Sequence, residues 1–149
     1  MQLEDFLVKA KINTYASVGE GGERKLDDGG KEFVYEEGEW KYRDRYFGFS
    51  PFIGEEVVWK DGKVIWAMNY YGRVLSEKVS PEEIYQFLKK ILRQVRAERP
   101  YRGPRQFKEG DFSYKNSNHG ALEDFEGLEI ILYQGSRIYE LRYIGGIVK

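Results

Sequence analysis

The sequence contains no cysteine, and it has a single histidine among its 149 residues. Without cysteine, the chain can form neither a disulfide nor a thiolate metal site. One histidine also cannot supply a histidine metal cluster, and no partners for a Ser-His-Asp arrangement are evident. We therefore expect no metal site and no cofactor, and we interpret His119, in KNSNHGALED, as a loop residue without a catalytic role.

Long hydrophobic runs are also absent. No stretch approaches the roughly 18 consecutive apolar residues that a membrane-spanning helix needs. The first residues, MQLEDFLVKAK, lack the apolar segment of a signal peptide. These two absences predict a cytoplasmic protein that does not associate with membranes.

Aromatic and charged residues are abundant instead. Aromatic residues make up 16% of the chain and charged residues 33%, yet the formal net charge is only -1. This composition favours a packed fold over disorder, with a core built on large flat side chains. The length suits one domain, so we expect residues 1–149 to form a single domain.

Two segments have the periodicity of amphipathic helices. Leu3, Phe6, Leu7 and Ala10 repeat at helical spacing and predict a short N-terminal helix. The second segment, 80–99, carries a longer apolar stripe. Ser80 at the N-cap, Pro81 at the first helical position and Glu83 two residues later form a capping box.

The remaining segments predict one long loop and several strands. Residues 16–30 are rich in glycine and predict a long loop. Asp61-Gly62 is a type I′ turn signal between two β-rich arms. Because strands follow strands without intervening helices, we expect an α+β fold with a curved, mainly antiparallel sheet of about six to seven strands, one long capped helix and a short N-terminal helix. The predicted strands cover residues 31–37, 39–47, the two arms of 55–72, 111–115, 128–133 and 137–144.

The glycine-rich loop does not have the features of a phosphate site. Gly19, Gly21 and Gly22 follow a helix and precede a strand, which is the reverse of the known phosphate-binding fingerprints. Acidic residues within the loop would also repel phosphate. Basic residues gather in 80–109 and acidic residues in 17–39. This distribution is typical of solvated surfaces, so nucleic-acid binding is disfavoured, although the two regions could meet across a homodimer interface.

One strand places a carboxylate among aromatic side chains. Alternation puts Trp40, Tyr42, Asp44 and Tyr46 on the same face. If that face is buried, Asp44 needs a partner, and its raised pKa suits a ligand anchor or a general acid or base. The alternative is that Asp44 lies in water at the strand end and that its neighbours are plain core.

The second arm of the hairpin is apolar on both faces, which predicts a cover on each side. Helices would cover one face, and a partner chain, a loop or a ligand would cover the other. Arg73 follows this arm and could anchor an anion. The predicted ligand-binding residues are Tyr42, Asp44, Tyr46, Trp66, Asn69, Tyr70, Tyr71 and Arg73.

A resemblance to a known family is carried by three runs: GEGGERKLDDGGKEFVYEEGEWKYRDRYFGFSPFIGEE, WAMNYYG, and the pair ILYQG and IYELRYIGG. Together they resemble the domain-of-unknown-function family numbered 5680. That family includes stand-alone proteins and domains that follow a helix-turn-helix module in bacterial regulators. The resemblance implies a shared fold and a sensing or binding role, without any catalytic residue to carry over. We expect no helix-turn-helix in this chain.

Three functions fit these observations. The leading prediction is a cytoplasmic module that binds or senses a small molecule in an aromatic pocket on the sheet. The second is an enzyme that uses carboxylate and tyrosine acid-base chemistry, with Asp44 and Glu56 as the carboxylates. The third is a structural or interaction protein that forms a homodimer through an aromatic face.

Overall fold

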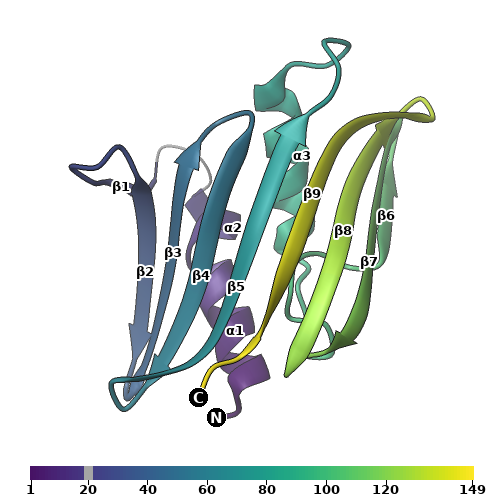
Figure 1. The fold of residues 1–149 in the computed structure, drawn as a ribbon. Helices are drawn as coiled ribbons and strands as arrows, with labels where there is room; N and C mark the ends of the chain where they lie inside the picture. The colour runs from purple at the N-terminus through teal and green to yellow at the C-terminus, as the bar shows by residue number, and fades with distance from the viewer. Residues whose placement is uncertain (19–21) are drawn as a thin grey trace.

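The computed structural model describes residues 1–18 and 22–149, and its strands form one antiparallel sheet (Figure 1). Within these residues the sheet has nine strands in the order β1-β2-β3-β4-β5-β9-β8-β7-β6. An α+β fold with an antiparallel sheet is therefore confirmed. The strands are β1 (Arg24–Lys25), β2 (Lys31–Glu37), β3 (Trp40–Gly48), β4 (Phe52–Lys60), β5 (Lys63–Val74), β6 (Gln106–Glu109), β7 (Phe112–Ala121), β8 (Asp124–Tyr133) and β9 (Ser136–Ile147).

The predicted number of six to seven strands is wrong because it omits the two edge strands. β1 and β6 have two and four residues, most of them exposed, so neither shows the alternation of a half-buried strand. β7 and β8 are also longer than predicted, which places His119 on a strand rather than in a loop. The segment around His119 contains asparagine and glycine, which disfavour strands intrinsically, and its pairing with β8 holds it extended.

Tight turns connect several strands as the sequence predicts. Asp61 and Gly62 both have positive φ, at 50° and 75°, as a type I′ turn requires. Gln134 and Gly135 repeat this geometry at 49° and 81°. These turns match the twist of the flanking strands and fix the register of the two hairpins.

The helices are α1 (Leu3–Ile12), α2 (Tyr15–Val18) and α3 (Pro81–Leu92). The Ser80 side chain accepts a hydrogen bond of 3.2 Å from the backbone N–H of Glu83, which confirms the predicted N-cap. The prediction that this helix reaches residue 99 is wrong, since the chain leaves the helix after Leu92. Val95 is still buried in the turn that follows, so the apolar stripe continues beyond the end of the helix.

The predicted loop 16–30 contains regular structure at both ends. Its first residues belong to α2, and β1 lies near its end. Residues 19–21, which include two of the loop glycines, lie outside the described residues.

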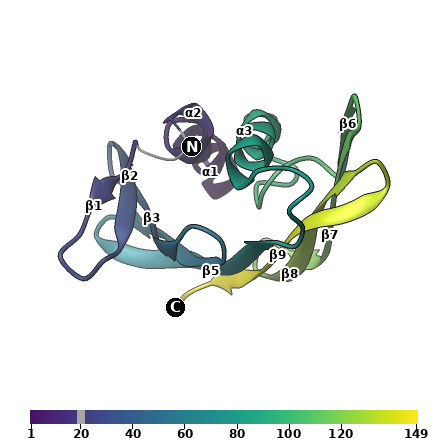
Figure 2. The ribbon, with the colours of Figure 1, turned by 90° about the horizontal axis from the view of Figure 1, so that it is seen from above.

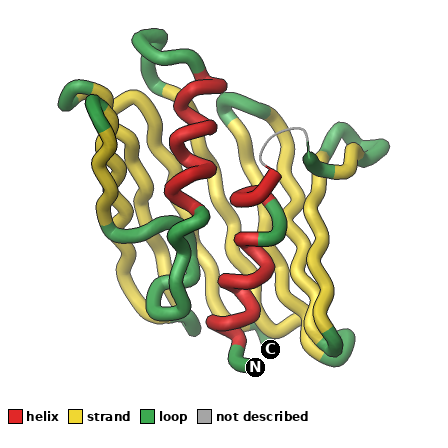
Figure 3. Tube along the Cα trace, turned by 180° about the vertical axis from the view of Figure 1, so that it is seen from behind, coloured by secondary structure: helices red, strands yellow, loops and turns green. Residues whose placement is uncertain are grey.

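The sheet curves around the helices, which lie on its concave side (Figures 2 and 3). We call this side the inner face and the opposite side the outer face. The inner face of β3 carries the four alternating residues of the sequence prediction, and all four are buried. The helices cover the inner face of the central strands, and the core between the two layers is rich in aromatic side chains, among them Phe6, Trp40, Tyr42, Trp66, Tyr85, Phe87, Tyr114, Phe125 and Tyr139.

The outer face is not covered by the described residues of this chain. It exposes apolar side chains, of which Tyr71 at 43% and Ile144 at 57% are examples. The prediction that β5 is covered on both sides therefore does not hold within the described chain. No helix among the described residues has the length and hydrophobicity required to span a membrane.

Candidate functional site

A cavity of about 50 Å³ lies between the inner face of β3, β4 and β5 and the helices. Among the described residues, its walls combine aromatic rings with four charged side chains. Tyr15 and Phe52 are only partly buried and form part of its rim. The lining residues are Lys11, Thr14, Tyr15, Ala16, Tyr42, Asp44, Tyr46, Phe52, Glu56, Tyr70, Tyr85, Leu88, Leu92, Tyr101 and Arg102.

Two carboxyl groups lie side by side in this cavity. Asp44 on β3 is paired in register with Glu56 on β4, so both side chains leave the sheet on the inner face. Directly opposed residues in an antiparallel pair have Cβ atoms about 5 Å apart. Asp44 is 8% exposed and Glu56 is 2% exposed. The fold therefore holds two acidic groups close together and away from bulk water.

Glu56 is held by a lysine and a tyrosine through a single oxygen. Its Oε1 accepts a hydrogen bond of 2.6 Å from the Tyr42 hydroxyl and lies 3.0 Å from Lys11 Nζ. Lys11 also donates to the backbone carbonyl of Tyr101. Burial lowers the pKa of the Lys11 ammonium, while the neighbouring Glu56 carboxylate acts in the opposite direction.

Asp44 is held by Tyr70, whose hydroxyl donates a hydrogen bond of 2.5 Å to Oδ1. Burial, and next the negative charge of Glu56, raise the pKa of Asp44 from 3.8 to about 7. The hydrogen bond from Tyr70 and the charges of Arg102 and Lys11 limit this rise. Asp44 is thus poised to exchange a proton near neutral pH.

The second oxygen of each carboxyl group has no partner among the described residues. Among the described residues, every hydrogen bond and ion pair to these groups ends on Asp44 Oδ1 or Glu56 Oε1. Some side-chain nitrogen atoms of the described residues are inaccessible to solvent and have no hydrogen-bond partner, but Asp44 Oδ2 and Glu56 Oε2 do not belong to this group. Each carboxyl group therefore offers the cavity one acceptor that no described residue uses.

A glycine makes the Tyr70 contact possible. Tyr70 lies opposite Gly54 on the adjacent strand, and its ring crosses that strand to reach Asp44 on the next one. A Cβ atom at Gly54 would lie 2.3 Å from the Tyr70 hydroxyl oxygen and 2.4 Å from Cζ. A side chain at this position would displace the Tyr70 ring and remove the donor from Asp44.

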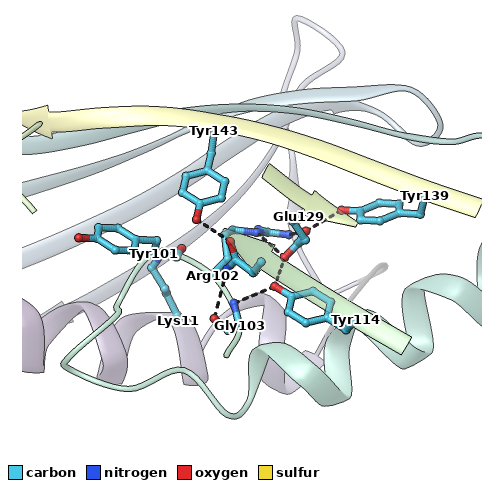
Figure 4. Close-up of polar contacts among 9 residues, drawn as sticks. Lys11, Tyr101, Arg102, Gly103, Tyr114, Glu129, Tyr139 and Tyr143 are labelled. Atoms are coloured by element: carbon cyan, nitrogen blue, oxygen red, sulfur yellow. Dashed lines mark hydrogen bonds and ion pairs between the residues drawn. The ribbon is translucent and has the colours of Figure 1, made fainter. Parts of the chain in front are cut away.

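A second buried acid lies next to the cavity and is fully engaged by its neighbours (Figure 4). Glu129 on β8 is 0% exposed. Arg102 donates to both of its oxygens, at 3.2 and 2.8 Å. The hydroxyl groups of Tyr114 and Tyr139 donate at 2.5 and 2.9 Å. Arg102 also lies 5.8 Å from the centre of the Tyr70 ring, which joins this cluster to the cavity.

The eight predicted site residues divide between three environments. The cavity contains Tyr42, Asp44, Tyr46 and Tyr70. Trp66 does not line it: this side chain is buried in the core, where its ring stacks on Phe125 with the ring centres 5.8 Å apart. The other three, Asn69, Tyr71 and Arg73, lie on the outer face.

The outer-face residues have surroundings of their own. Arg73 forms an ion pair of 3.2 Å with Glu140. Asn69 and Tyr71 border a groove of about 890 Å³ on the outer face. Exposed apolar side chains line this groove together with charged ones, including Phe47, Ile53, Ile144, Glu126 and Arg142.

The list of eight residues omits several that complete the cavity. Lys11 follows Leu7 by four positions, so it continues the apolar stripe of the N-terminal helix, and a lysine at such a position signals a buried charge. Tyr101 and Arg102 lie in the connection between α3 and β6, where no local pattern reports a tertiary contact. The sequence prediction includes Glu56 only as a carboxylate of the alternative acid-base enzyme.

The comparisons with known proteins give one match. The model of a family described as a domain of unknown function, DUF5680, matches residues 44–148. This range includes both carboxyl groups of the cavity but not Lys11 or Tyr42. No curated protein and no solved structure matches the chain. Among the described residues, no group of three or more histidine, aspartate or glutamate side chains could hold a metal ion.

Proposed function

We propose that this chain, which belongs to the domain-of-unknown-function family DUF5680, is a ligand-binding module that takes a small molecule into the cavity between the sheet and the helices. The proposal narrows the aromatic pocket of the sequence prediction to the inner face of β3, β4 and β5.

The observation that carries this proposal is a pair of carboxyl oxygens, Asp44 Oδ2 and Glu56 Oε2, on residues that line the cavity; neither oxygen has a partner among the described residues. A buried acceptor without a donor costs about 1–3 kcal/mol, so such atoms are retained where something else satisfies them. A cavity needs about 10–15 Å³ of accessible volume to hold one water, so a cavity of about 50 Å³ has room for water or for the head group of a ligand.

The walls of the cavity suit recognition of a small molecule. Tyrosine rings offer flat contact area at a low cost in conformational entropy, and the few polar groups fix the orientation of the ligand. Most of these groups lie on strands and are held by buried hydrogen bonds, so the site is formed before binding.

Native mass spectrometry on protein purified without added ligand tests the proposal. We expect extra mass on the native species that disappears on denaturation. Asp44→Asn should reduce the occupied fraction, whereas Glu55→Gln should not, because Glu55 lies on the same strand and its side chain is half exposed on the outer face. Equal occupancy in both variants would place the ligand elsewhere.

An acid-base enzyme is the second candidate, favoured by the same pair of carboxyl groups. Asp44 has a pKa of about 7 and lies beside a second carboxyl group and two tyrosine hydroxyls. Such a pair can donate and accept protons near neutral pH. Incubation of the released ligand with fresh protein distinguishes the two functions: a change in the mass of the ligand that Asp44→Asn abolishes indicates catalysis, and an unchanged mass indicates binding.

A homodimer formed through the outer face is the third candidate. The exposed apolar side chains along the groove of that face favour it. Analytical ultracentrifugation tests it with Ile144→Lys, a substitution at an exposed position of β9. We expect this variant to dissociate such a dimer, and a wild-type monomer at high concentration would contradict the proposal.

A further inference from the structure

We infer that the ligand presents a small ammonium group to Asp44 and Glu56. This inference rests on the proposed function and names the class of ligand. It follows from which charges of the cavity are already paired and which hydrogen-bonding atoms are left over.

The two positively charged side chains that line the cavity among the described residues are each paired with a carboxylate of the protein. Lys11 lies 3.0 Å from Glu56 and donates to the Tyr101 carbonyl. Arg102 is bound through two nitrogen atoms to Glu129. An anionic ligand would have to compete with these buried carboxylates for its partners, and removing one member of a buried ion pair is strongly unfavourable.

Two carboxyl acceptors are left over among the described residues. Asp44 Oδ2 and Glu56 Oε2 face the same space from neighbouring strands, and a carboxylate can only accept hydrogen bonds. An ammonium group carries three donors and a positive charge. It would satisfy both oxygens and relieve the repulsion between the two carboxylates, which a neutral donor does only in part.

The surroundings of Asp44 fit this assignment. The titratable groups that interact with it include Glu56 from β4, Tyr70 from β5, Lys11 from α1, Arg102 from the connection after α3, and Tyr42 on its own strand. In the absence of a ligand, Asp44 can avoid the repulsion from Glu56 by retaining a proton. A bound ammonium would replace that proton, so binding should release a proton near neutral pH.

The remaining walls and the donor set favour an organic cation over a metal ion. The rings of Tyr46, Phe52 and Tyr70 line the cavity, and aromatic faces attract ammonium groups. Calcium takes six to eight oxygen ligands, far more than the two free carboxyl oxygens offered here. The volume of about 50 Å³ fits a group of the size of methylammonium, and the rest of a larger ligand would pass the rim formed by Tyr15 and Phe52.

The test is an NMR titration of the full chain with three small probes. Methylammonium and methanol have the same number of heavy atoms, and formate represents small anions. We expect methylammonium to shift the side-chain carboxyl signals of Asp44 and Glu56 with a Kd on the order of 10 mM, as a ligand with two heavy atoms allows. Methanol and formate should bind at least 10-fold more weakly.

A matched pair of variants locates the binding. Asp44→Asn keeps the shape of the side chain and removes its charge, so the affinity for methylammonium should fall at least 10-fold. Glu55→Gln removes the same charge from the opposite face of the neighbouring strand, and its affinity should stay within twofold of wild type.

The wild-type protein provides an internal test that needs no variant. With Asp44 titrating at about 7, only about 1% of the chains are ionised at this group at pH 5, so methylammonium should bind about 100-fold more weakly there than at pH 8. Methylammonium itself keeps its charge throughout this range.

Two results would overturn the inference. Methanol or formate shifting the same carboxyl signals at lower concentration than methylammonium would show that the site prefers another class of ligand, while the proposed function would stand. Methylammonium affinity that is unchanged by Asp44→Asn and by pH would show that the carboxyl pair does not recognise the cation. The proposed function itself would fail on the native mass spectra, which do not depend on these probes.

Discussion

Two buried acidic clusters lie next to each other on the inner face of the sheet, and they are built differently. Glu129 has two guanidinium contacts and two tyrosine hydroxyls on its two oxygens. Asp44 and Glu56 line a cavity, and the described residues provide each of them with donors on one oxygen only. Both clusters use tyrosines and a buried cation, so the types of residue do not separate them.

The difference between the clusters lies in how completely their hydrogen bonds are made. A buried carboxylate with every acceptor position used is a rigid structural group, and its removal leaves a buried cation without a partner. A buried carboxyl group with a free oxygen is available to another molecule. We therefore expect Glu129 to serve stability, and we propose that the pair Asp44 and Glu56 serves binding; the predictions below test this division.

The largest effect is expected at Glu129. Glu129→Gln removes the charge that neutralises Arg102, whose side chain is only 10% exposed, and this should lower the free energy of unfolding by about 3–5 kcal/mol. Urea denaturation measures the change. Glu126→Gln, at an exposed position of the same strand, is the control and should change the value by less than about 0.5 kcal/mol. Equal effects of the two variants would refute the structural role of Glu129.

The next largest effect concerns the pH dependence of stability. The pKa of Asp44 is about 7 in the folded protein and 3.8 when the group is unperturbed. Between these two pH values, Asp44 is therefore protonated in the folded state and ionised in the unfolded state. Its contribution to stability is present at low pH and is lost as the pH rises through 7. Wild type should lose about 2–3 kcal/mol from this group between pH 5 and pH 8.

Asp44→Asn removes this titration. The variant should therefore lose less stability than wild type between pH 5 and pH 8, as urea denaturation at the two values would show. Lys11 has the opposite dependence because burial lowers its pKa from 10.5, so its contribution rises with pH on the alkaline side. An equal change in the stability of wild type and Asp44→Asn between pH 5 and pH 8 would contradict this prediction.

A smaller effect is expected from two adjacent tyrosines on β5. Tyr70→Phe removes the donor to Asp44 and should cost about 1–2 kcal/mol of stability, and it should raise the pKa of Asp44 further. Tyr71→Phe changes the same group on the outer face and should have an effect within about 0.5 kcal/mol. Thermal unfolding of both variants at pH 8 measures the two changes in stability. A larger loss of stability in Tyr71→Phe than in Tyr70→Phe would contradict the prediction.

The smallest effect is expected at Arg73. Its ion pair with Glu140 is exposed on the arginine side, so Arg73→Ala should change stability by less than about 1 kcal/mol. The variant should also leave binding in the cavity unchanged, because Arg73 lies on the outer face. If the ligand mass is lost from native spectra of this variant, the result would support the sequence prediction that Arg73 anchors an anionic ligand.

The local patterns of the sequence predict much of the fold, and four of the eight residues that they single out line the cavity. Alternation places Tyr42, Asp44 and Tyr46 on one buried face of β3, and Ser80 marks the start of α3. The positions of Trp66 and Tyr71 are harder to predict. Alternation shows that these two residues lie on opposite faces of β5, but it does not reveal which face the helices cover or where a space remains.

The contacts that complete the site come from distant parts of the chain. Glu56 is paired with Lys11 from the N-terminal helix, and Arg102 reaches Glu129 from an irregular connection. Local sequence patterns carry no information on such pairs, which depend on how helices and sheet pack. The free carboxyl oxygens are a consequence of this packing and cannot be derived from alternation alone.

A titration of the Asp44 side-chain carboxyl group by carbon-detected NMR tests the central claim most directly. The signal can be assigned by its absence in Asp44→Asn. We predict a midpoint at about pH 7, because the group is buried beside Glu56 and retains its proton until then. A midpoint near 4, the value of an aspartate in water, would contradict the account, since it would show that Asp44 is neither desolvated nor coupled to its neighbour.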